Sequence, residues 1–369
     1  MNRGRRLVSP LVVMIMAVAA VSLMPASIAG RAQALPRTAA DTSTSPRTPW
    51  GDPNLQGVWS AGYILTPLER PAKYAGREFL TDEEVAALEK EARDTFGKGG
   101  GAASGVRLTS GGRPQRGTVE DVAGAYNDVF SGRGTRVVRT KRTSLIVDPP
   151  DGQIPALTPE GQKRVGSRGG QIIDAETGPG GRADNPEERG LDRCLGATLP
   201  LDFGSAAVSG GYLRIVQTPG YVSIYYEDGH HGGVYRTISL DGRPHLPPQI
   251  RQWLGDARGH WEGDTLVVDT TNFTDQTNFR GSKKGLHLIE RFTRAADDMF
   301  MYRVTIDDPT TFTQRWIIEV PHGKSDERKN QIFEAACHEG NYALTGVLAG
   351  ARVQEREKAA AAKKKAASK

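Results

Sequence analysis

From Tyr212 to Ala336 the chain reads as a series of short strand candidates separated by hairpin signals. Runs rich in β-branched and aromatic residues are broken by turns such as Thr218-Pro219-Gly220, Asp241-Gly242 and Gly263-Asp264. Turn signals at such close spacing predict antiparallel hairpins, and hence an all-β sandwich or barrel. The expected strands are 213–217, 221–226, 234–240, 260–262, 265–271, 286–293, 300–306, 316–320 and 332–336.

The segment ahead of these strands predicts a smaller extension. Gly57-Val58-Trp59 reads as a first strand, and residues 143–148 read as another short one. Thr81-Asp82-Glu83-Glu84 is a capping box that opens an amphipathic helix through about Asp94. Because the first strand lies early and its partners lie late, we predict a single domain over residues 49–352.

The tripeptide Gly57-Val58-Trp59 resembles the Gly-x-Trp start of lipocalin-like barrels. About eight meander strands can close into a barrel that holds one small ligand. We therefore expect a mainly β fold, in which an antiparallel meander closes into a lipocalin-like barrel with an N-terminal helix and loop extension.

Longer stretches are similar to a family of secreted bacterial proteins that carries no assigned activity. They are WGDPNLQGVW (50–59), SLIVDPP (144–150), GDARGHWEGD (255–264), ERFT (290–293) and CHEGNY (337–342). The resemblance covers most of the chain and implies one globular unit in a secreted setting.

Residues 1–34 have the three parts of a secretory signal. Three early arginines precede an apolar run, residues 7–24, and small residues then allow cleavage after Ala29 or Ala34. The run is broken early by a proline and is short for a bilayer span of about 20 residues. We predict export to the periplasm or the extracellular space, with no stable membrane span after removal of the signal.

The formal net charge of +5 is carried by the two ends of the chain. Residues 1–34 hold four arginines and no acid, and the Lys/Ala-rich tail, residues 353–369, holds six cations and two acids. The body between them is slightly acidic, and residues 35–48 read as a flexible leader. Because a nucleic-acid-binding protein carries positive charge on its folded domain, we predict no nucleic-acid partner.

The two cysteines, Cys194 and Cys337, are far apart in the sequence. In an oxidising compartment an even pair is most simply a disulfide, and we predict that they form one. A buried pair of thiols and a metal site at Cys337-His338 are the alternatives.

Glu290 is the first candidate for chemistry. Alternation along 286–293 places it on the more apolar face, together with Leu286, Leu288 and Phe292. A carboxylate among apolar neighbours either pairs with a cation, such as Arg303 or Arg315, or has a raised pKa and acts as an acid or base.

The richest polar cluster is 225–231, where a strand enters a glycine-rich turn. Glu227 and His231 could act there as an acid/base pair, and with Glu290 they are the catalytic candidates. The candidates for ligand contacts are Tyr225, Arg258, Arg291, His338, Glu339 and Asn341.

Zinc is a minor alternative that would use His231, His260 and His338. The sequence has no His-x-His or His-Glu-x-x-His spacing, so we predict neither a metal ligand set nor a cofactor. The first hypothesis is a small, partly apolar organic molecule bound in a barrel cavity. The second is a cofactor-independent hydrolase or lyase that uses Glu227/His231 or Glu290.

Overall fold

Strands form where apolar and polar residues alternate, because successive side chains of a strand point to opposite faces of the sheet. In strand β8 (His287–Ala296), Leu288, Glu290 and Phe292 are at most 1% exposed, whereas the residues between them are partly exposed. The predicted inward face of this strand is thereby confirmed.

The computed structural model describes residues 46–61, 64–96, 136–165, 198–200, 212–227, 233–329, 332, 339 and 343–367, which belong to the compact unit Ser45–Lys369. Besides β8, the elements are β1 (Gly57–Ser60), the 3-10 helix η1 (Ala72–Tyr74), α1 (Asp82–Phe96), β2 (Ile146–Asp148), α4 (Pro159–Val165), β3 (Tyr212–Thr218), β4 (Tyr221–Tyr226), β5 (Val234–Ser239), β6 (Asp256–Glu262), β7 (Thr265–Thr271), β9 (Met299–Asp307), β10 (Trp316–Lys324) and α5 (Ala343–Ala367). None of the helices in the described part of the chain has the length and apolar character that a membrane span needs.

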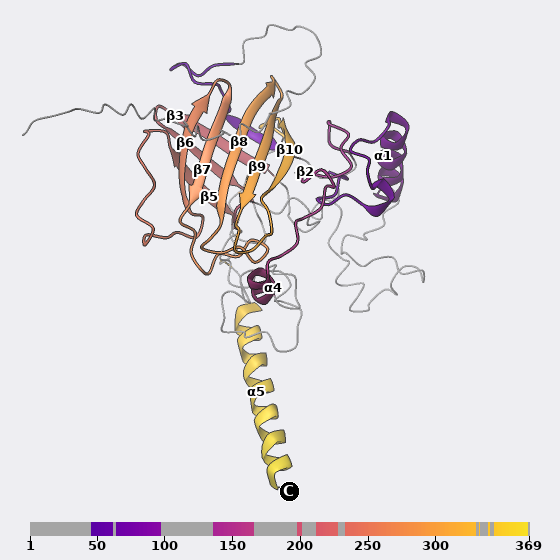
Figure 1. Ribbon diagram of the computed structural model, residues 1–369, viewed down its shortest axis with the longest axis vertical. Coiled ribbons are helices and arrows are strands. Elements are labelled where there is room, and N and C mark those ends of the chain that lie inside the picture. The colour runs from indigo at the N-terminus through magenta and orange to yellow at the C-terminus, as the bar shows by residue number, and fades with distance from the viewer. Residues whose placement is uncertain are drawn as a thin grey trace, which may run out of the picture. The chain divides into compact units, whose positions relative to one another are not determined.

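Nine of the described strands close into a barrel (Figure 1). The order runs from β1 to β3 and on to β10, and β10 pairs back with β1 through Trp59↔Lys324 and Ser60↔Gly323. Strand β2 is a short tenth strand that pairs with Ile317 and Ile318 of β10, away from the residues of β10 that pair with β1. The prediction of a mainly β, lipocalin-like barrel with an N-terminal extension is confirmed.

One contact in the barrel departs from the antiparallel meander. Strands β5 and β6 run parallel and share the single pair Ser239↔Arg258, whereas β4 and β5 are joined by six pairs. A ring of nine strands cannot alternate in direction all the way round, because nine is odd, so one neighbouring pair must be parallel. The connection 240–255 returns the chain to the end of the barrel where β5 began.

Two elements that the sequence predicts from short motifs, a hairpin turn and a helix start, are present in the structure. In the turn between β3 and β4, Gly220 has a φ of +81°, which glycine adopts without strain. At the start of α1, Glu84 N–H donates to Thr81 Oγ1 and Thr81 N–H donates to Glu84 Oε2, so the capping box is confirmed. The predicted strand 332–336 lies outside the described residues except for Ile332, which is in no strand.

Both ends of the barrel are covered. At one end, Leu55 N–H donates to the buried Gln217 side chain at 2.6 Å, and Arg294 donates to the Asn54 carbonyl at 2.7 Å. At the other end, the connection between β7 and β8 buries Phe273 and stacks Phe279 on Trp316.

The N-terminal extension is attached to the edge of β10 that also pairs with β2. Glu319 N–H donates to the Leu145 carbonyl, and Leu145 N–H donates in turn to the Pro67 carbonyl. The segment that leads to β2 therefore links the barrel to residues 64–96.

Candidate functional site

The barrel interior holds a polar cluster, which we call the lumen cluster: Tyr226, Arg236, Glu290 and Tyr302. Arg236 on β5 binds both carboxylate oxygens of Glu290 on β8, each at 2.7 Å. It also donates to the Tyr226 hydroxyl at 3.0 Å, while the Tyr302 hydroxyl donates to Glu290 at 2.8 Å. All four residues are at most 5% exposed.

The electrostatics of this cluster favour a fixed ion pair. Burial raises the pKa of Tyr226 to about 12 and the pKa of Tyr302 well above its usual range, so both hydroxyls stay protonated. Burial works against the charge on Arg236, but the Glu290 carboxylate outweighs it and the pKa of Arg236 is raised. Glu290 therefore pairs with a cation, but with neither Arg303 nor Arg315, the two expected partners. Arg303 faces outward and lies 3.7 Å from Glu319, and Arg315 is exposed.

Large side chains fill the lumen beside this cluster. The His322 ring stacks on Phe300 with centroids 4.8 Å apart, and Trp59 meets Phe300 edge-on at 5.0 Å. Burial lowers the pKa of His322 to about 4, so this imidazole is neutral at physiological pH. The lumen as described is thus a packed core.

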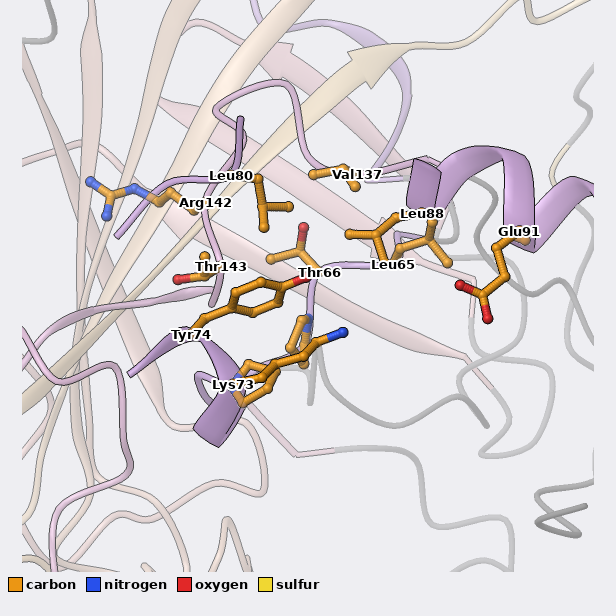
Figure 2. A pocket seen from close by; sticks show the side chains of 13 residues that line it. Leu65, Thr66, Lys73, Tyr74, Leu80, Leu88, Glu91, Val137, Arg142 and Thr143 are labelled. Carbon is orange, nitrogen blue, oxygen red and sulfur yellow. The ribbon is translucent and has the colours of Figure 1, made fainter. Parts of the chain in front are cut away.

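A cavity lies outside the lumen, in the N-terminal extension; we call it the side cavity (Figure 2). Its volume is about 350 Å³. Three short pieces of chain, 65–80, 88–92 of α1 and 137–143, supply its walls. The lining residues are Leu65, Thr66, Pro67, Pro71, Lys73, Tyr74, Leu80, Leu88, Glu91, Ala92, Val137, Arg142 and Thr143.

A third cluster lies on the outer face of the barrel, which we call the outer His/Asp chain: Asp256, His245, Asp269 and His287. The two ring nitrogens of His245 lie 2.9 Å from Asp256 Oδ2 and 2.9 Å from Asp269 Oδ1. His287 Nε2 lies 3.1 Å from both oxygens of Asp269. Arg258 holds Asp256 through its Nε, at 3.1 Å.

These contacts shift the titration of three of the groups. Burial opposes the charge on both aspartates, but hydrogen bonds outweigh it. Asp256 is hydrogen-bonded by Leu246 N–H, His245 and Arg258, and Asp269 is hydrogen-bonded by His287 and His245. Both pKa values are lowered. The hydrogen bond to Asp269 raises the pKa of His287, with a further contribution from the charge of Asp307.

The structure does not gather the sequence-predicted site residues into one place. Tyr225 faces outward opposite Tyr235, and Glu227 follows β4, where its N–H donates to the Tyr212 carbonyl. Arg258 binds Asp256, and Arg291 binds Glu262 at 2.7 Å. His260 also contacts Glu262, and Glu339 is exposed. His231, His338, Asn341, Cys194 and Cys337 lie outside the described residues.

The sequence analysis identified Glu290 but missed its partner Arg236 and the outer His/Asp chain, for different reasons. Arg236 could have been found, because it lies two residues before the apolar, buried Ile238 and so shares the inward face of β5. The outer His/Asp chain joins a loop residue, His245, to three strands, and no local pattern signals that meeting. Among the described residues, no group of three or more histidine, cysteine, aspartate or glutamate side chains is arranged to hold a metal ion.

No family model matches the chain, and no curated protein matches it. Two solved structures do, both mutants of the fluorescent protein UnaG, each with 15% identity and a TM-score of 0.23. The aligned region covers 37% of this chain and 87% and 86% of the two UnaG chains. We base no conclusion about fold or function on a similarity this weak, and the assignment of a barrel rests on the strand pairing alone.

Proposed function

We propose that this protein is exported and binds a small, partly apolar organic molecule in the side cavity, not in the barrel lumen. The observation that carries the proposal is the cavity of about 350 Å³, with a mainly apolar wall and a few polar groups. Small-molecule sites have this composition and begin at roughly 300 Å³.

The barrel's part in this proposal is to hold the cavity wall in place. Arg142, which lines the cavity, also contacts Glu319 on β10 at 3.8 Å and Glu78 in the extension. A packed lumen suits this supporting part better than it suits a binding site. Export is supported by residues 1–34, and it would favour the proposed Cys194–Cys337 disulfide.

We expect Leu88→Trp to weaken binding of a ten-carbon probe, decan-1-ol, at least tenfold. The indole would occupy cavity volume, because Leu88 lines the side cavity. The neighbouring Ala87 is exposed on the same helix, so Ala87→Trp adds the same bulk without filling the cavity and should bind as the wild type does. Titration calorimetry measures both affinities. Equal affinity of Leu88→Trp and the wild type would place the probe elsewhere and overturn the proposal.

An acid/base enzyme is the second candidate, and the outer His/Asp chain is the observation that favours it. A histidine oriented by a carboxylate can take up and release protons near neutral pH. The chain would act as a cofactor-independent hydrolase or lyase, with His287 and Asp269 in the part that was assigned to Glu227, His231 and Glu290.

The titration of His287 tests this second candidate. We expect its pKa above 6.5 in the wild type and a shift back toward 6.5 in Asp269→Asn, since the raising hydrogen bond and charge are then lost. The ion pair adds stability that is complete below pH 6.5 and disappears as the pH rises through the raised pKa. NMR titration of the imidazole protons measures this, with His260 as the exposed control. A His287 pKa that does not change in Asp269→Asn would contradict the assignment.

A further inference from the structure

We propose that the side cavity takes an amphiphilic carboxylic acid whose carboxylate pairs with the Lys73 ammonium. This inference rests on the proposed function and names the class of molecule that the same cavity binds. Three observations support it: the placement of Lys73, the state of the other cations around the cavity, and the apolar wall.

Lys73 lies in η1 and lines the cavity. Its Nζ lies 4.8 Å from the centroid of the Tyr74 ring, which also lines the cavity. Figure 2 shows Tyr74 between Thr143 and Lys73. A cation over an aromatic face is attracted to it by the negative charge density of the ring face. The ammonium is therefore held at the cavity wall.

Two other cations near the cavity, Arg77 and Arg142, are already paired with carboxylates. Arg77, whose guanidinium lies 5.4 Å from the same Tyr74 ring, pairs with Glu84. Arg142 pairs with Glu78 and lies near Glu319. Among the described residues no carboxylate forms an ion pair with Lys73. Glu84 pairs with Arg77, and its pKa is lowered first by the Thr81 and Arg77 hydrogen bonds and least by the more distant charge of Lys73. The charge of Lys73 is thus available to a bound anion.

The rest of the wall sets the orientation of the molecule. Leu65, Leu80 and Leu88 offer an apolar surface to a hydrocarbon chain or ring. In Figure 2 Glu91 lies apart from Lys73, at the α1 side of the cavity. A second acidic group at that side would be repelled, so the cavity favours a molecule with one carboxylate over a diacid.

The test compares decanoate with decan-1-ol, two probes with the same chain and different heads. At pH 7 and low salt we expect the wild type to bind decanoate about tenfold more tightly. Lys73→Gln should remove that preference and leave the affinity for decan-1-ol unchanged. The matched control is Lys163→Gln, an exposed lysine on α4 that does not line the cavity, and it should keep the preference. Titration calorimetry supplies all the affinities.

The outcomes separate the two proposals. Binding of both probes with equal affinity by the wild type would overturn the carboxylate assignment and keep the cavity as a binding site. Equal weakening of both probes by Lys73→Gln would also overturn it, because Lys73 would then act through packing and not through charge. Binding of neither probe would overturn the proposed function itself, and this inference with it.

Discussion

Arg236→Met is expected to lower the free energy of unfolding by about 3–5 kcal/mol, since removing one partner of a buried ion pair leaves the other charge uncompensated. Here the stranded charge is Glu290, which is fully buried. Its two hydrogen bonds from Arg236, at 2.7 Å each, would be lost. The Tyr302 hydroxyl donates one hydrogen bond to Glu290 but carries no positive charge, so it cannot replace the guanidinium.

The double variant Arg236→Met/Glu290→Leu should recover most of that loss, because apolar residues of similar size often replace a buried pair at little cost. Urea unfolding at pH 7 measures both. Arg291→Met is the matched control: Arg291 lies next to Glu290 on β8, but it faces outward and its pair with Glu262 is half-exposed. We expect a loss of at most about 1 kcal/mol there. A single Arg236 variant as stable as this control would show that the lumen cluster is not a fixed pair.

Gly255→Ala is expected to destabilise the protein by about 3 kcal/mol or more. Gly255 precedes β6 with a φ of +71°, which costs an L-residue roughly 1–2 kcal/mol. A Cβ there would also stand 2.6 Å from the Thr271 carbonyl oxygen, and a backbone atom of the barrel cannot move aside cheaply.

The control for this change is Gly263→Ala in the turn between β6 and β7. Gly263 has a similar φ, +59°, but a Cβ there meets nothing within 4 Å. It should therefore lose only the conformational part, about 1–2 kcal/mol. Thermal and urea unfolding of the two variants isolate the contribution of the close contact. Equal losses would mean that the chain relaxes freely where it enters β6 from the 240–255 connection.

Features that depend on neighbouring residues were predictable from the sequence. The period of two placed Glu290 inward on β8, and the turn at Gly220 and the capping box at Thr81 were set by groups within three residues of each other. The expectation of a ligand cavity in the lumen depended on contacts between residues that are far apart in the sequence. Whether a barrel interior is open or filled depends on how side chains such as Trp59, Phe300 and His322 pack together, and strand patterns carry no information on that.

The sequence by itself thus determined the strands, their hairpins and the inward face, because each follows from local backbone preference and from alternation along one strand. Only the tertiary structure decided the partners. Arg236 meets Glu290 because strand register across the closed ring brings them together, and the parallel contact of β5 with β6 exists because the ring has nine strands. The side cavity joins three segments, and the outer His/Asp chain joins a loop to three strands. Contacts of this kind depend on how the whole chain closes, which no local pattern contains.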